Sequence, residues 1–446
     1  MTPTSLRQPL PPAQRLTQRA LSAFEHLLHV QASSGTVLLL ASVVALIWAN
    51  SAFSTSYVAL WHLELGISFA GATIAQPLHF WINDGLMTLF FLVVGMEVRH
   101  EIHAGSLSRL REASLPVFAA LGGVLVPALV FLAFNHEAPQ RAGWAVPTAT
   151  DIAFAVGLLA LLGRSIPHQV RVFLLALAVI DDLVAVLIIA VFYSGGLDAA
   201  GLPWIALALA LVLLLQHLGV NRALVYVLPG LLLWWGVLVL GAHPTLAGVM
   251  LGLMTPVEPL RRRIPPMTLI KRYGWQVLRR QDGGPQAWVE PLRKLKRAQR
   301  DLLPPTIRIQ ALLHLWVAFL VMPLFALANA GISLQELDWG NSVATGVTVG
   351  VAVALAAGKP VGILLTCWLA IRVGWGRLPE GMSWQGLVLV GLFAGVGFTM
   401  SIFIALLAFD GEMLLNATKL GVLLGSVVAA CLGMGWGWLC FRRTGR

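Results

Sequence analysis

Apolar stretches of about twenty residues recur along the chain, and they limit the folds that it can adopt. In lipid a segment must satisfy its own backbone polar groups, and a stretch of this length does so as a membrane-spanning α-helix. Of the 446 residues, 58% are hydrophobic and 11% are charged, whereas a soluble domain carries about a quarter charged residues. The sequence therefore predicts an all-α polytopic membrane protein.

The apolar windows predict twelve membrane spans, which place both chain ends on one side of the membrane. Of the 30 Lys and Arg residues, 27 fall in the two tails and the even-numbered loops, which the positive-inside rule assigns to the cytoplasm. The expected spans are 33–51, 77–98, 115–134, 143–162, 170–194, 201–217, 222–240, 243–257, 309–331, 345–372, 386–408 and 415–441. The expected regions are a cytoplasmic N-terminal arm at 1–32, spans 1–8 within 33–256, a basic cytoplasmic loop at 257–308, spans 9–12 within 309–441 and a cytoplasmic tail at 442–446.

Two segments outside the spans have a helical pattern of their own. Apolar residues at helical spacing in 16–28 fit an amphipathic helix on the membrane surface, or an ordinary solvated arm. The loop at 257–308 carries thirteen Lys and Arg against four acidic residues, and Trp288, Leu292 and Leu295 in it fit a short interfacial helix. Attraction to anionic lipid explains this charge more simply than nucleic-acid binding, so we expect lipid as the partner and no nucleic acid.

Five ionisable residues are predicted to lie at membrane depth: Asp84, Asp151, Asp181, Asp182 and Lys359. A charged side chain at that depth costs on the order of several kcal/mol of free energy unless it is paired or faces water. A single buried carboxylate could simply tie two helices together. Four acids and one lysine in one protein favour a functional site.

Asp181 and Asp182 are expected near the middle of the bilayer, because Asp181 stands about eleven residues into its span. Neighbouring helical residues point about 100° apart, so one carboxylate can face a cavity while the other meets a neighbouring helix. Two close carboxylates in a low dielectric resist ionising together, so one of them can hold a proton near neutral pH. Such a carboxylate can carry either a proton or a hard cation.

Two spans contain residues that break a helix at mid-depth. Asp151 follows Pro147 and Thr148 in the fourth span, and the eleventh span contains the glycine-rich stretch 395–399. Interrupted spans in corresponding places of two halves indicate the binding site of a transporter. In the tenth span, Lys359 lies too deep to reach water easily and needs a carboxylate partner, for which Asp181 is the candidate.

At these residues the chain resembles the sodium/proton antiporters of the NhaA family. The motifs follow the family order over most of 33–440, and together they are specific to it. They are WINDGLMTLFFLVVGMEVRHE (81–101), GWAVPTATDIAFAVG (143–157), ALAVIDDL (176–183), HPTLAG (243–248), LFALANAGISL (324–334), GKPVG (358–362) and GFTMSIFI (397–404).

The resemblance implies a fold of inverted-topology repeats, with two discontinuous helices crossing at mid-membrane. It also implies roles for the buried residues. Asp182 would be the central carboxylate for Na+ and H+, with Asp181, Asp151 and Thr150 around it, and Lys359 would balance the acids. Asp181 and Asp182 would hold Na+ or Li+ transiently. Asp84 would line the ion funnel or support it.

A pH response is a further property that the resemblance implies. Its candidate residues are Glu97, His100, Glu101, His243 and His314. His100 stands where the family usually has an arginine, and could titrate near neutrality or be a solvated helix-end residue. Gln310 and Ala311 replace a Glu-His pair, which puts the pH threshold in doubt but not the exchange.

The function that we predict is electrogenic export of Na+ or Li+ in exchange for protons, more active at alkaline pH, across a bacterial inner membrane. The alternative is a sodium- or proton-coupled symporter of a small solute. No nucleotide loop, nucleophile motif or metal-spaced His/Cys cluster appears in the sequence, so neither an enzyme nor a cofactor is predicted. Residues 64–75 alternate weakly and fit a periplasmic hairpin, through which the family forms homodimers.

Overall fold

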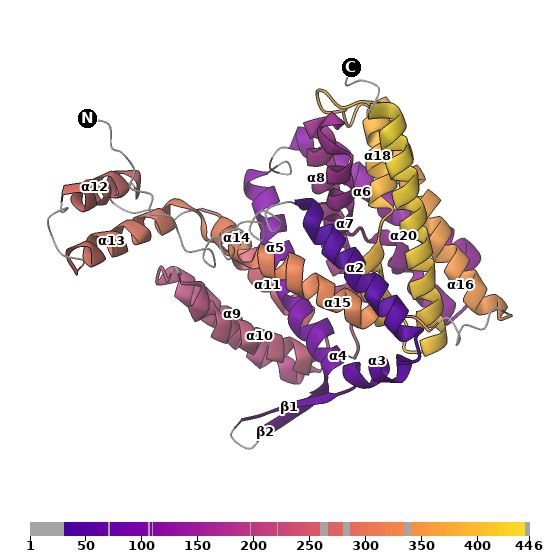
Figure 1. The fold of residues 1–446 in the computed structure, drawn as a ribbon, viewed down its shortest axis with the longest axis horizontal. Coiled ribbons are helices and arrows are strands. Elements are labelled where there is room, and N and C mark those ends of the chain that lie inside the picture. Colours follow the sequence, from indigo (N-terminus) through magenta and orange to yellow (C-terminus); the bar gives the residue numbers. More distant parts are fainter. Residues whose placement is uncertain are drawn as a thin grey trace, which may run out of the picture.

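The computed structural model describes residues 31–69, 72–105, 108, 110–196, 198–220, 222–258, 266–279, 286–333 and 340–441. It is a bundle of long, tilted helices with a two-stranded hairpin at one end (Figure 1). The surface helix expected in 16–28 lies outside the described residues.

Among the described residues, eight continuous helical stretches are long and apolar enough to cross a membrane, and three further pairs of helices pass the same test together but are bent by more than 40°. If each bent pair is one span, eleven spans result, and the short apolar helix α11 (Thr245–Met254) accounts for the remaining predicted segment. Every expected span coincides with one of these elements, so the prediction of an all-α polytopic membrane protein is confirmed. The inverted-repeat symmetry stays a prediction.

The remaining elements in the bundle follow in chain order. They are α2 (Gln31–Ala49), α3 (Ser54–Trp61), α4 (Leu78–Phe80), η1 (Trp81–Leu86), α5 (Met87–Ala104), α6 (Leu110–Phe134), η3 (Gln140–Thr148), α7 (Ile152–Leu161), η4 (Gly163–Ser165), α8 (His168–Phe192), η5 (Ala199–Gly201), α9 (Leu202–His217), η6 (Ala223–Tyr226), α10 (Val227–Leu240), α14 (Pro305–Trp316), η7 (Val317–Val321), α15 (Met322–Asn329), α16 (Ser342–Val353), η8 (Ala354–Gly358), α17 (Lys359–Val373), α18 (Trp384–Ala394), α19 (Phe398–Ala408) and α20 (Glu412–Phe441).

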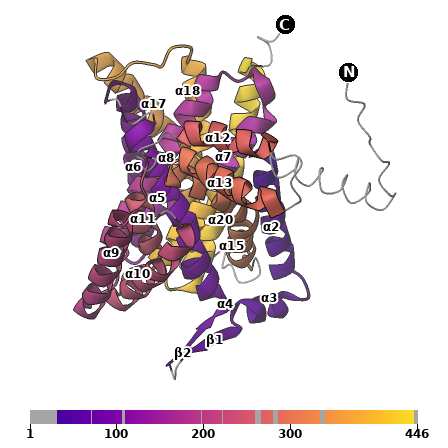
Figure 2. The ribbon, with the colours of Figure 1, turned by 90° about the vertical axis from the view of Figure 1, so that its left-hand side faces the viewer.

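The hairpin consists of β1 (Glu64–Phe69) and β2 (Ala72–Pro77), which pair antiparallel with Glu64 opposite Pro77. This confirms the hairpin expected at 64–75. Helix α3 precedes it and is turned by 117° from α2, so it does not continue the first span. Both views place the hairpin at the end of the bundle opposite the C-terminal end of α20 (Figures 1 and 2).

Three of the spanning stretches contain a π-helical turn: η1, η7 and η8. Asp84 lies within η1, and η8 ends directly before Lys359 and Pro360. Proline has no backbone N–H, so the regular hydrogen-bond ladder cannot pass through it, and a π-turn accommodates the interruption. The sequence predicted these spans as regular helices and missed the turns, although such turns often accompany functional residues.

The backbones of α5 and α11 come close enough to require glycine. A Cβ atom at Gly95 would lie 2.6 Å from the carbonyl oxygen of Val249, and one at Gly248 would overlap the carbonyl oxygen of Thr88. Small residues at helix contacts allow this approach, in which van der Waals packing replaces the hydrophobic effect as the stabilising force. The two helices therefore form one closely packed pair.

Gly248→Ala should lower thermal stability, because the new methyl group would force α5 and α11 apart at a cost of about 1–3 kcal/mol. The measurement is the melting temperature of the detergent-purified protein. Gly435→Ala is the matched control, since Gly435 lies in α20 with no atom within 4 Å of its added Cβ. Equal melting temperatures of the two variants would contradict the close packing.

Candidate functional site

Two of the three bent pairs, η3 with α7 and α18 with α19, break at residues 149–151 and 395–397, close to each other in space. The backbone N–H of Asp151 in the first break donates to the carbonyl oxygen of Val396 in the second, at 2.8 Å. The breaks predicted around Pro147–Asp151 and 395–399 are therefore present, and they meet. Four helix ends, two N-termini and two C-termini, face one region inside the bundle.

The Asp151 carboxylate accepts hydrogen bonds at the N-termini of both α7 and α19. Its Oδ1 accepts from the backbone N–H of Phe154 at 3.0 Å, which caps α7. Its Oδ2 accepts from the backbone N–H of Thr399 at 3.1 Å and from the hydroxyl of the same residue, at the start of α19. A carboxylate is favourable at the positive end of a helix, and this one lies between two such ends while only 1% exposed.

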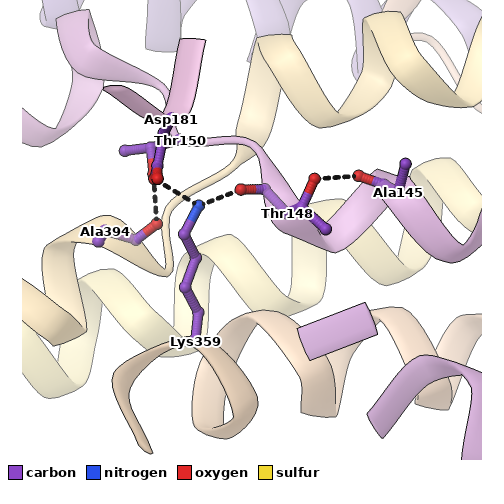
Figure 3. Close-up of polar contacts among 6 residues, drawn as sticks. All are labelled: Ala145, Thr148, Thr150, Asp181, Lys359 and Ala394. Atoms are coloured by element: carbon purple, nitrogen blue, oxygen red, sulfur yellow. Dashed lines mark hydrogen bonds and ion pairs between the residues drawn. The ribbon is translucent and has the colours of Figure 1, made fainter. Parts of the chain in front are cut away.

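Two donors meet the helix C-termini. The Lys359 ammonium, with 0% exposure, lies 3.0 Å from Asp181 Oδ2 and donates to the carbonyl oxygen of Thr148, the last residue of η3, at 2.5 Å (Figure 3). The hydroxyl of Thr150 lies 2.7 Å from Asp181 Oδ2 and 3.1 Å from the carbonyl oxygen of Ala394, the last residue of α18. The expected contact between Lys359 and Asp181 is present. Lys359 also bonds the carbonyl oxygen at the end of η3, so the ion pair is joined to a helix break.

Asp182 has a different environment from its neighbour. It is 1% exposed, and neither of its carboxylate oxygens has a hydrogen-bond partner among the described residues; Asp181 Oδ1 also lacks one. The charged groups within electrostatic range of Asp182 are Glu97, Asp181, Asp151 and Lys359. A buried carboxylate without a partner is costly as an anion unless it meets water, binds a cation or takes up a proton.

The oxygen atoms of this region suit a hard cation, which prefers carboxylate, hydroxyl and carbonyl ligands. In the part of the chain that the structure describes, no three His, Cys, Asp or Glu side chains gather as a metal site. A cation beside Asp182 would therefore use two aspartates at most, completed by hydroxyl, carbonyl or water oxygens.

The other predicted site residues lie outside this cluster. Glu97, His100 and Glu101 are on α5, and α5 packs against α8 and α14, the helix that carries His314. His243 lies apart from them, in the turn between α10 and α11, with its Nε2 3.0 Å from the carbonyl oxygen of Tyr193. The pH-response candidates therefore do not form one group.

Asp84 is also separate from the aspartates of α8, as a residue of the π-turn η1. Its carbonyl oxygen accepts from the indole N–H of Trp234 at 3.1 Å and from the hydroxyl of Thr88. These contacts hold the turn against α10 and leave the carboxylate half-buried. The geometry fits a supporting position rather than a place in the cluster around Asp182.

Three hydroxyl residues of the site were missed by the sequence analysis. Thr399 bonds Asp151, Ser426 of α20 accepts from the backbone N–H of Phe398 at 3.2 Å, and the buried hydroxyl of Ser401 has no partner among the described residues. A signal existed for Thr399, since Ser and Thr are preferred at helix starts and a helix break was expected just before it. Nothing comparable pointed to Ser426 or Ser401.

Comparison with known proteins identifies the family of the chain. The family model described as Na+/H+ antiporter 1 matches residues 25–436. Two similar proteins, each named Na(+)/H(+) antiporter NhaA, come from Bordetella petrii, at 59% identity over 97% of this chain and 94% of the relative, and from Cupriavidus necator, at 58% identity over 98% and 94%. A third of that name, from Bartonella henselae, is 48% identical over 97% of this chain and 96% of its own length. The motif resemblance is confirmed, and the chain belongs to the Na+/H+ antiporter 1 family.

Proposed function

We propose that this protein exports Na+, or Li+, in exchange for protons by alternating access at the aspartate site, with Asp182 as the exchanging carboxylate. The single observation that carries the proposal is the Asp182 side chain, which is buried with both oxygens unpartnered among the described residues. Membership of the family makes the chain a secondary transporter and not an enzyme. The names of its relatives support Na+ and H+ as the two substrates.

The exchange follows from the charge of the cluster. A proton arriving at Asp182 neutralises it and removes the negative charge that holds Na+, so the two ions compete for one carboxylate. Asp181 keeps one oxygen in contact with Lys359 and Thr150, while its Oδ1 remains available to a bound ion. Asp181 is also a second place for a proton. More than one proton for each Na+ makes the exchange electrogenic and driven by an inside-negative potential.

The membrane setting belongs to the same proposal. The charge distribution supports a multi-pass protein of the bacterial inner membrane with both termini in the cytoplasm. The hairpin of β1 and β2 supports a homodimer, because it presents strand edges at one end of the bundle. The excess of Lys and Arg in 257–308 supports contact with anionic lipid.

Asp182→Asn should abolish exchange and leave the protein folded, because the amide keeps the volume but cannot bind and release a proton. The measurement is Na+-driven proton movement in proteoliposomes without any organic solute. Asp410→Asn is the control, since Asp410 is exposed between α19 and α20 and its variant should keep exchange. Normal activity of the Asp182 variant would rule out a single exchanging carboxylate at this position.

Lys359→Ala should weaken exchange and lower the stability of the protein by about 3–5 kcal/mol, the usual cost of leaving one partner of a buried ion pair alone. The double variant Lys359→Ala, Asp181→Asn should recover part of that stability, because it removes the unpaired charge as well. Melting temperatures of the wild type, both single variants and the double variant give the coupling between the two residues. Additive losses would show that the contact contributes nothing to stability.

Acid should inhibit exchange by competition, so raising the Na+ concentration should move the acid limb of the pH profile to lower pH. Activity should be retained at alkaline pH, where the aspartates hold fewer protons. His100→Arg should change the acid limb little, because the competing protons bind at Asp181 and Asp182. The measurement is exchange rate against pH at low and saturating Na+. If the acid limb of the profile stays at the same pH when Na+ is raised, but shifts in the His100→Arg variant, the result would instead indicate a separate pH sensor on α5.

A further inference from the structure

Two amphipathic helices between α11 and α14 play no part in the site described above. They are α12 (Pro266–Arg279) and α13 (Gln286–Leu302), which pack against each other. Figure 1 shows the pair to the left of the helix bundle, and both views show it away from the hairpin of β1 and β2 (Figures 1 and 2). The backbone N–H of Thr306 donates to the carbonyl oxygen of Pro256 at 3.4 Å, so the chain leaves the bundle and returns to it at one point.

An apolar stripe on this pair is exposed. Pro291 and Ala298 of α13 are buried, whereas large apolar side chains elsewhere on the two helices are 40–64% exposed. The exposed residues are Met267, Trp275, Trp288, Val289 and Leu292. At 100° per residue, Trp288 and Leu292 fall on one side of α13, next to its buried face. Exposed tryptophan and leucine along one face are typical of helices that lie in a membrane interface.

Basic side chains follow the apolar stripe. Arg293 and Lys296 of α13 are exposed, and at 100° per residue they lie just beyond Leu292, away from the buried face. Lys271 and Arg272 are exposed on α12. Lys294 pairs with Glu290 at 2.6 Å, so that charge is partly offset within the helix. The sequence of α13 contains five Lys and Arg against two acidic residues, so this helix carries a net positive charge.

We infer that α12 and α13 form a hairpin that lies flat on the cytoplasmic surface of the bilayer and binds anionic phospholipid. Its apolar stripe enters the headgroup boundary, and Arg293, Lys296 and the basic residues of α12 contact lipid phosphates. This deepens the lipid partner proposed above and rests only on the proposed membrane setting. A nucleic acid would satisfy the charges but leave the apolar stripe in water, whereas an anionic bilayer satisfies both.

The test is hydrogen–deuterium exchange of the full-length protein in nanodiscs made of phosphatidylcholine alone or with one third phosphatidylglycerol. Amides of residues 286–302 should exchange more slowly in the anionic discs, with about a fivefold effect for each Lys or Arg held at the surface. At 1 M KCl, where the Debye length is about 3 Å, the difference should largely disappear. Amides of α9 and α10 should exchange equally in both discs and serve as the internal reference.

Two pairs of substitutions separate charge from helix structure. Arg293→Glu with Lys296→Glu should remove the difference between the discs, while Arg293→Lys with Lys296→Arg should preserve it. Val289→Ser with Leu292→Ser should reduce protection in the anionic discs without changing the charge.

Equal exchange in the two discs, or an unchanged lipid effect in the Glu variant, would overturn the inference. Strong protection in both discs would also overturn it, because the protection would then not depend on anionic lipid. None of these measurements depends on transport, so they stand or fall separately from antiport.

Discussion

The carboxylate of Asp151 is the contact on which the rest of the site depends. It accepts hydrogen bonds at the starts of α7 and α19, whose sequence positions differ by about 250 residues. A broken helix inside a membrane leaves backbone groups unsatisfied, and their dipoles would repel each other where two like ends meet. One negative charge between the two N-termini removes both problems. The donors Lys359 and Thr150 meet the carbonyl oxygens at the opposite ends.

This arrangement explains why two neighbouring aspartates can differ so much. Asp181 faces the broken helices and takes part in their hydrogen bonding through Lys359 and Thr150. Asp182 points elsewhere on α8, because adjacent residues are about 100° apart, and finds no protein donor in the described structure. One carboxylate therefore takes part in the hydrogen bonding of the helix breaks, whereas the other has no protein partner among the described residues, which is why we propose Asp182 as the exchanging group.

Much of this could be predicted from the sequence, because a bilayer imposes simple rules. Span positions follow from hydropathy, and Asp151, Asp181, Asp182 and Lys359 stand out because charges are rare at that depth. The helix breaks followed from proline and glycine at mid-span. What remained hidden depends on contacts between distant segments: Thr399 with Asp151 and Ser426 with Phe398 could not be assigned without the fold. The π-turn before Lys359 was missed because a span containing proline can also continue with a kink.

The glycine contacts between α5 and α11 have a mechanical consequence. Backbones that touch at Gly95 and Gly248 have no side-chain layer between them to repack, so a shift of one helix must carry the other with it. Helix α5 carries Glu97 within electrostatic range of Asp182, and the chain beyond α11 is bonded through Pro256 to the start of α14. A displacement of α5 would therefore move α11 with it as one rigid body, and the contact at Pro256 joins that pair to the start of α14. Gly95 and Gly248, which have no side chains, therefore couple the movements of α5 and α11.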